Sequence, residues 1–178
     1  MGISLKARIF LLLSIVLVSV AADQVSKIWA QDTLAYEYQP GQFYGQHERV
    51  IVSNFFNLIY KENPAAAFSI TSSIPDWFRK PFLLTVSILA TFLFLIWYFR
   101  LKEADWLILS SFSMVIGGAI GNFLDRFRMG YVIDFLDVHA GFLGYPHAHW
   151  PTFNIADSCI VVGAIGILLH SYWVKKDA

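Results

Sequence analysis

The sequence predicts an all-α integral membrane protein that has four transmembrane helices and a small β-rich domain outside the membrane. Hydrophobic residues make up 57% of the 178 residues and charged residues only 15%, whereas a soluble domain has about 45–50% and about 25%. The apolar residues form four long runs, each bounded by charged residues. One connection between the runs is rich in β-branched and aromatic residues, which is typical of strands.

A membrane-spanning helix needs about 20 residues, and the runs are long enough if the first continues past its first acidic residue. The predicted spans lie at about 8–30, 81–99, 106–124 and 156–174. With the outer connections at about 31–80 and 125–155, they are predicted to form a single membrane-embedded domain over residues 1–178.

The first run has some features of a cleavable signal peptide. Basic residues precede it, and small residues at 20–22 follow its apolar centre. However, Asp23 and Lys27 are four residues apart and can pair on one helical face, and Trp29 lies where an interfacial anchor is expected. We therefore expect a retained first helix that ends near Ala30.

The distribution of basic residues predicts the orientation of the spans. Short basic segments favour the cytoplasmic side, and three of them would share one side if there are four spans: Lys6 and Arg8, Arg100 and Lys102, and Lys175 and Lys176. Both termini are then cytoplasmic and the two longer connections face outward. The outer connections also contain basic residues, so the bias is not complete.

The first outer connection predicts one or two strands around residues 50–60, followed by a turn at Asn63-Pro64. Residues 74–82 mix apolar, aromatic and basic side chains, so we expect this segment to lie in the membrane interface before the second span.

This topology brings polar residues together at the outer membrane face. Ionisable groups at membrane depth are costly and are candidates for function. The residues at the outer span ends are Asp23, Lys27, Asn122, Asp125, Arg126, Asn154 and Asp157, and the loop between the last two spans adds Asp134 and Asp137.

Two carboxylates at one site cannot easily both ionise, so one keeps a proton. One acid can then activate a water while the other donates a proton to a carbonyl. Asp157 and Asp134 are the leading pair, and the spacing leaves Asp137 as a rival of Asp134. The alternative is structural: Asp157 or Asn154 caps the fourth span, and Asp134 is an ordinary loop residue.

Other polar residues favour structural roles. Asn122, Asp125 and Arg126 fall at i, i+3 and i+4 at the end of the third span, where Arg126 can pair with an acid or a backbone carbonyl. For Asp125 and Arg126 we expect a structural ion pair that closes the helix end, and not direct chemistry. Gly117 and Gly121 form a GxxxG pattern that permits close helix packing.

Metal and cofactor chemistry are not predicted. His139, His147 and His149 lie near Asp137, but there is no HExxH motif and their spacing is not specific for a metal. No GxSxG motif supports a serine mechanism, and Cys159 has no partner for a disulfide. The formal net charge is zero, so we expect no nucleic-acid partner.

Five motifs occur in the order found in one family. They are DQVSK at 23–27, ENPAAAFS at 62–69, GGAIGNFLDR at 117–126, GYVIDF at 130–135 and FNIADS at 153–158. On these residues the chain resembles the bacterial lipoprotein signal peptidases, also called signal peptidase II, which are integral-membrane aspartic peptidases. The motifs span nearly the whole chain.

The resemblance implies four spans in the bacterial cytoplasmic (inner) membrane, with both termini cytoplasmic and the active site near the outer face. It implies that Asp134 and Asp157 form the catalytic dyad, and so decides against Asp137. The site-shaping residues it implies are Asp23, Lys27, Asn63, Asn122, Asp125, Arg126 and Asn154. The implied substrates are diacylglyceryl-modified prolipoproteins, and no metal or organic cofactor is expected. Beyond substrates, we expect contacts with membrane lipids and a monomer.

Two features depart from the family pattern. The family usually has glycine two residues after Asn63, where this chain has Ala65 preceded by Pro64. The loop between Asp134 and Asp157 is long, and its histidines are outside the pattern. Two other classes are weighed: a membrane scaffold whose acids serve as caps and ion pairs, and a transporter. The transporter ranks low because the acids gather at one face and no inverted repeat is visible.

Overall fold

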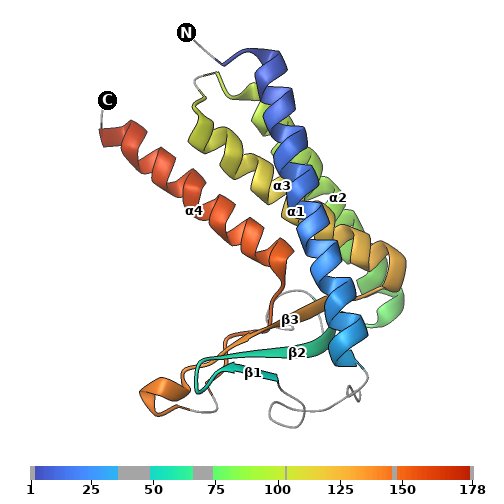
Figure 1. The fold of residues 1–178 in the computed structure, drawn as a ribbon. Helices are drawn as coiled ribbons and strands as arrows, with labels where there is room; N and C mark the ends of the chain where they lie inside the picture. The colour runs from blue at the N-terminus through green and yellow to red at the C-terminus, as the bar shows by residue number, and fades with distance from the viewer. Residues whose placement is uncertain (1–2, 36–48, 66–73, 103, 146–147, 177–178) are drawn as a thin grey trace.

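The fold is taken from a computed structural model, which describes residues 3–35, 49–65, 74–102, 104–145 and 148–176. Its four helices are each long and apolar enough to cross a membrane, which confirms the predicted fold class. They are α1 (Leu5–Leu34), α2 (Asp76–Arg100), α3 (Trp106–Met129) and α4 (Ile155–Lys176), shown in Figure 1. The described chain also contains strands β1 (Arg49–Val52), β2 (Phe56–Asn63) and β3 (Val132–Val138) and the short 3-10 helix η3 (Gly141–Leu143).

The helices begin and end close to the predicted positions, with three differences. Helix α3 reaches Met129 instead of ending near 124, so the start of the expected outer connection is helical. Helix α1 continues past Asp23 as expected, but reaches Leu34 instead of ending near Ala30. Helix α2 already begins at Asp76, with Pro81 inside it, so most of the expected interfacial segment at 74–82 forms the first turns of the span. Pro81 lies in the second turn of α2 and has no N–H to donate to the carbonyl of Trp77, so the helix lacks one hydrogen bond there.

The four helices and the sheet occupy opposite ends of the molecule. The beginning of α1, the connection between α2 and α3, and the end of α4 lie at one end, and the three strands lie at the other (Figure 1). The α3 end that carries the sheet is closed by Gly130, whose φ of 81° is the left-handed conformation that ends many helices. Both chain ends therefore lie on the side away from the sheet.

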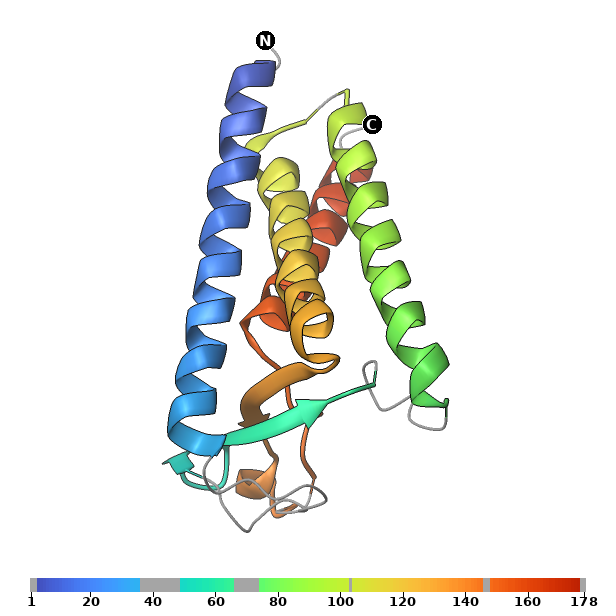
Figure 2. The same ribbon diagram turned by 90° about the vertical axis from the view of Figure 1, so that its right-hand side faces the viewer.

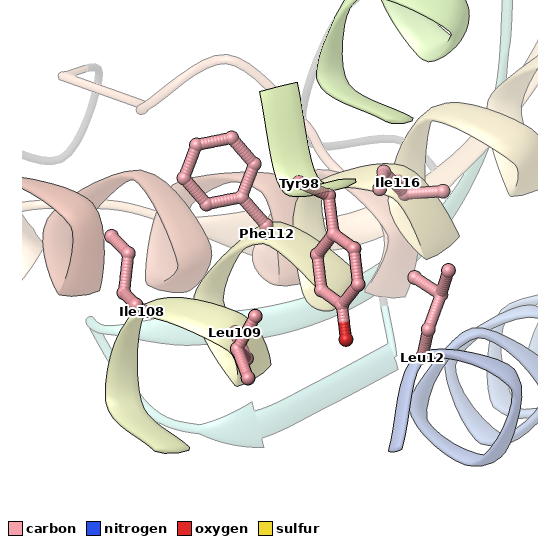
Figure 3. Packing of buried hydrophobic residues seen from close by; sticks show 6 residues of the cluster. All are labelled: Leu12, Tyr98, Ile108, Leu109, Phe112 and Ile116. Carbon is pink, nitrogen blue, oxygen red and sulfur yellow. The ribbon is translucent and has the colours of Figure 1, made fainter. Parts of the chain in front are cut away.

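Helix α3 is the centre of the bundle. It packs against α1, α2 and α4, and Figure 2 shows it between α1 and α2 with α4 behind. The buried apolar cluster lies mainly on α3 and consists of Leu12, Tyr98, Ile108, Leu109, Phe112 and Ile116 (Figure 3). The Tyr98 hydroxyl donates to the Arg8 carbonyl at 2.7 Å, and Arg8 Nη1 donates to the Leu101 carbonyl at 2.8 Å. These two bonds join α1 to α2 at the end away from the sheet.

The predicted close packing at Gly117 and Gly121 is found against α1, at Ser19 and Asp23, and other glycines allow α3 and α4 to approach closely. A Cβ atom on Gly163 of α4 would lie 2.5 Å from the carbonyl oxygen of Ser111 on α3. A Cβ atom on Gly118 of α3 would lie 2.3 Å from the carbonyl oxygen of Ala156 on α4. Both distances are shorter than van der Waals contact with a backbone atom, so only glycine fits at these crossings.

The strands form one antiparallel sheet in the order β1-β2-β3. The strands expected around residues 50–60 are confirmed as β1 and β2. The sequence predicts a loop over Asp134 and Asp137, whereas the structure has strand β3 there. Four consecutive residues at the start of β3 are buried, so the sequence shows no alternation of apolar and polar residues that would mark a strand. In the register of the sheet, Asp134 on β3 pairs with Lys61 on β2.

We expect Gly163→Val to weaken the bundle, because the added side chain must push apart α3 and α4 at a backbone contact. Overpacking of this kind costs about 1–3 kcal/mol. Thermal unfolding in detergent should show a lower midpoint for Gly163→Val than for the control Ala164→Val, one residue further on and exposed. Equal midpoints for the two variants would contradict the close α3–α4 crossing.

Candidate active site

Polar side chains from α1, α3, the start of α4, β2 and β3 converge at the end of the bundle that carries the sheet. The structure brings together every residue that the sequence assigned to the site: Asp23 and Lys27 from α1, Asn63 from β2, Asn122, Asp125 and Arg126 from α3, Asp134 from β3, and Asn154 and Asp157 at the start of α4. Most of them are buried: Asp23, Lys27, Asn122, Asp125, Asp134 and Asn154.

The ammonium group of Lys27 lies at the centre of this cluster. It donates to Asp23 Oδ2 at 2.8 Å, to Asp125 Oδ2 at 2.8 Å and to Asn122 Oδ1 at 3.0 Å. These three contacts use all three N–H donors of the group. Lys27 is only 2% exposed, and a buried charge is tolerated when it is paired and fully hydrogen-bonded.

The two carboxylates that hold Lys27 also hold neighbouring backbone. Asp23 Oδ1 accepts from the backbone N–H of Ala156 at 2.9 Å, in the first turn of α4. Asp125 Oδ2 accepts from the backbone N–H of Ile133 at 3.3 Å, at the start of β3. Gly121 leaves room for this arrangement, since a Cβ atom there would lie 2.6 Å from Asp23 Oδ2. The Lys27 cluster therefore fixes the positions of α4 and β3 relative to α1 and α3.

Gln24 belongs to this cluster and was missed by the sequence analysis. Its Nε2 donates to Asp125 Oδ1 at 2.9 Å and to Asp23 Oδ2 at 3.2 Å, so it bridges the two carboxylates. Its Oε1 accepts from Arg128 Nη1 at 3.3 Å. Gln24 lies within the DQVSK motif, but a glutamine next to an aspartate carries no spacing signal that would assign it to a site.

Asn154 and Asp157 form a reciprocal cap at the start of α4. Asn154 Oδ1 accepts from the backbone N–H of Asp157 at 2.9 Å, and Asp157 Oδ2 accepts from the backbone N–H of Asn154 at 3.3 Å. This is the geometry of a capping box, with Asn154 as the cap residue. The other carboxylate oxygen of Asp157 accepts from Asn122 Nδ2 at 2.7 Å. The structural and the functional interpretation of Asp157 are therefore compatible.

Asp134 faces the same asparagine from the opposite side. Its Oδ1 accepts from Asn154 Nδ2 at 2.8 Å and its Oδ2 from Asn63 Nδ2 at 2.9 Å. The carboxyl group is 1% exposed. Burial, and then the nearby charge of Asp157, raise the pKa of Asp134 to about 7, against the weaker opposing effect of its two asparagine donors. Asp134 thus lies beside Asp157, with Asn154 bonded to both.

Asp137, the rival of Asp134 in the sequence, lies outside this cluster. It is also on β3 and buried, but its carboxylate contacts His149 Nδ1 at 2.8 and 2.9 Å. The rings of His139 and His149 are stacked with their centroids 4.9 Å apart. Within the described residues no group of three or more possible ligands could hold a metal ion, and His147 lies outside those residues.

The sequence predicts a structural ion pair at the end of α3. Asp125 forms one, with Lys27 at 2.8 Å, whereas Arg126 forms none among the described residues. In the described part of the chain, the Arg126 side chain makes no hydrogen bond or ion pair, and its Nε is buried. Its positive charge is nevertheless close enough to act on Asp157, Asp134 and Asp125.

The turn after β2 forms without the glycine that the family usually has. Asn63 Oδ1 accepts from the backbone N–H of Ala65 at 3.1 Å, a local bond that stabilises a turn. Among the described residues, Asn54 is the one non-glycine residue with a positive φ, so Ala65 has an ordinary backbone conformation. Because Asn63 also donates to Asp134, this turn sets the position of one acid.

Fold and site together define the class of protein: a four-helix membrane protein with two facing carboxyl groups at one end of its spans. The sequence matches the family described as Signal peptidase (SPase) II over residues 15–173. It is 38% identical over 169 residues to the lipoprotein signal peptidase of Syntrophotalea carbinolica, which covers 94% of this chain and 93% of that protein. The corresponding protein of Francisella tularensis subsp. novicida is 34% identical over 173 residues, covering 97% and 96%.

Solved structures agree with this match. The fold is similar to that of a bacterial membrane enzyme solved by the in meso method at 2.3 Å, with a TM-score of 0.72 and 24% identity, covering 99% of this chain and 93% of that one. A second bacterial membrane enzyme, solved at 1.9 Å, gives a TM-score of 0.64 at 25% identity and covers 95% and 94%. The chain belongs to the signal peptidase II family and is a multi-pass bacterial membrane enzyme, an aspartic peptidase, as the sequence predicted.

We expect Lys27→Gln to destabilise the protein strongly. The substitution leaves the carboxylates of Asp23 and Asp125 buried without their cation, and breaking a buried ion pair in this way costs about 3–5 kcal/mol. Chemical unfolding in detergent micelles should show this loss, while the exposed Lys102→Gln control should unfold like the unsubstituted protein. Adding Asp125→Asn to Lys27→Gln should recover part of the stability; no recovery would mean that the buried charges are not coupled.

Proposed function

We propose that this protein is a membrane-embedded aspartic endopeptidase that removes the signal peptide from diacylglyceryl-modified prolipoproteins, cleaving before the lipidated cysteine. The observation that carries the proposal is the position of Asn154. Its side chain donates to Asp134 and accepts from the backbone N–H of Asp157, and its own backbone N–H donates to the Asp157 carboxylate. It holds two carboxyl groups side by side at the end of the spans. The substrate class is that of the relatives, which are named lipoprotein signal peptidases.

The two acids divide the chemistry between them. Asp134, with its raised pKa, keeps the shared proton and donates it to the oxygen of the scissile carbonyl. The carboxylate of Asp157 takes a proton from a water molecule, whose oxygen attacks the carbonyl carbon. The tetrahedral intermediate collapses when the C–N bond breaks and the proton held by Asp157 passes to the leaving amine. The hydroxyl proton of the intermediate returns to Asp134 as the new carboxyl group forms.

The remaining residues support this pair. Asn63 and Asn154 each donate to Asp134, and Asn122 donates to Asp157, so both acids are held in fixed orientations. Arg126 adds a positive charge beside the acids. Lys27 and its partners hold the helices and β3 that carry these groups.

The orientation follows from charge and from the substrate. We place the end of the bundle with Lys6, Arg8, Arg100 and Lys102 in the cytoplasm, which puts both termini inside and the site near the outer face of the inner membrane. The lipid chains of the precursor remain in the bilayer and hold the scissile bond at the outer interface. A site at the ends of α3 and α4 lies at the depth where an anchored substrate meets it. A monomer contains all of these groups.

We expect Asp134→Asn and Asp157→Asn each to abolish cleavage of a diacylglyceryl-modified precursor, with a loss of at least about 10³-fold in kcat, because neither variant retains both an acid and a base. Asp32→Asn, an exposed acid near the same end of α1, is the matched control and should keep full activity. The assay compares the purified variants on the lipidated precursor and on its unlipidated form. Substantial cleavage by either active-site variant, with its fold intact, would contradict the dyad and favour a non-enzymatic scaffold.

The activity is expected to fall as the pH rises through about 7, where Asp134 loses its proton and the pair can no longer protonate the carbonyl. Asn63→Ala removes a hydrogen bond that stabilises the ionised form of Asp134, so the pKa of Asp134 rises. The upper limb of the pH–rate profile should therefore move to higher pH by about half a unit to one unit. Exposed Gln31→Ala should leave the limb in place; a shift to lower pH in Asn63→Ala would contradict the assignment of the proton to Asp134.

A further inference from the structure

A second buried acid on β3 is engaged in a contact that the proposed chemistry does not use. Asp137 is 0% exposed, both of its carboxylate oxygens lie within 2.9 Å of His149 Nδ1, and Asn57 Nδ2 on β2 donates to its Oδ2 at 3.4 Å. The His149 side chain is itself only 10% exposed. Removing a carboxylate from water is costly, so a buried carboxylate on a strand next to the site calls for a partner and for a role.

His149 lies on the segment that leads back from the sheet to α4. Residues 148–153, here called the return segment, run antiparallel to β3. The Trp150 N–H donates to the Val138 carbonyl at 2.8 Å, and Phe153 and Leu136 exchange hydrogen bonds of 2.9 and 3.1 Å. The Phe135 N–H also donates to the Phe153 carbonyl at 3.0 Å, and the Ala140 N–H to the Ala148 carbonyl at 3.0 Å. The two pairs Leu136–Phe153 and His139–His149 form isolated bridges and not a continuous strand, so side-chain contacts add to what holds the register.

The register of the return segment decides where Asn154 lies. Asn154 follows the segment directly, and it carries the hydrogen bonds that join Asp134 to Asp157. In paired strands a slip of one residue sends each side chain to the opposite face. A slip of the return segment on β3 would therefore withdraw Asn154 from Asp134. The Asp137–His149 contact lies on the same pair of segments and opposes such a slip.

We propose that Asp137 and His149 are positioning residues, whose contact locks the return segment onto β3 in the one register that lets Asn154 hold both acids. This inference rests on the proposed peptidase function and assigns a role to two residues outside the dyad. Asp137 acts through His149 and the return segment, and it does not touch the reacting atoms. Stacking of His139 on His149 supports the histidine ring from its other side.

The pKa of Asp134 depends on this register. The groups that carry charge around Asp134 are Asp157 from α4, Lys27 from α1 and Arg126 from α3, with Lys61 as its register partner on β2. None of them lies on the return segment. Loosening that segment weakens the donation from Asn154 to Asp134, which favours the neutral acid and raises the pKa of Asp134.

The test compares Asp137→Ala with Asp137→Asn, which keeps an acceptor for His149 Nδ1, on a lipidated precursor. We expect Asp137→Ala to lower kcat per folded molecule about tenfold with KM changed less than about twofold, and to move the upper pH limb upward by about half a unit. Asp137→Asn should restore most of kcat. The matched control is His170→Ala, which removes the histidine near Asp105 at the opposite end of α4 and should change neither quantity.

A variant that is expected to fold well separates positioning from stability. Asp137→Leu, His149→Phe and Asn57→Leu together replace the buried polar contact, including the donor Asn57, by apolar groups of similar shape, a change that is often neutral for stability. We expect this triple variant to unfold near the unsubstituted protein and yet to keep the lower kcat and the shifted limb. Full kcat with an unshifted limb would overturn the positioning role. An unsubstituted protein that does not cleave the lipidated precursor would overturn the proposed function, and the positioning role with it.

Discussion

The buried ammonium group of Lys27 is the interaction on which the rest of the site depends. It satisfies Asp23 and Asp125, and these two carboxylates in turn accept from backbone N–H groups at the start of α4 and of β3. A single cation therefore ties two helices to the two segments that carry the acids. Buried charges without such pairing would destabilise the bundle, so the removal of one member leaves the other members unpaired and costly. The glycines of α3 belong to the same constraint, because the helices must be close for the contacts to form.

Much of the fold could be predicted because its signals are local. The lengths of the apolar runs and the charges that bound them set the four spans, and the β-branched residues around 50–60 indicated β1 and β2. Strand β3 could not be predicted in the same way. Its first residues, including Val132 and Asp134, are buried together, and a strand buried on both faces shows no alternation. Its position depends on pairing with β2, which is distant in the sequence.

The site could be predicted as a set of residues more readily than as a set of contacts. The topology placed the polar span ends at one face, and the structure brings those residues together. The predicted topology did not indicate that Asp125 pairs with Lys27 and not with Arg126, nor that Gln24 bridges two carboxylates. The choice between Asp134 and Asp137 also required the structure or the family, since both are acids on one short segment. Partners that are about a hundred residues away leave no spacing pattern to read.

The pairing of Asp23 with Lys27 has a consequence for how the protein enters the membrane. The two residues are one helical turn apart on α1, whereas Asp125 and Ala156 are synthesised much later in the chain. The first span can therefore reach the bilayer with its opposite charges already neutralising each other, at a far smaller cost than two separate ions. When the third and fourth spans arrive, this pair becomes the fixed point on which they dock. The pair that organises the finished site thus also lowers the cost of placing α1 in the bilayer before α3 and α4 are inserted.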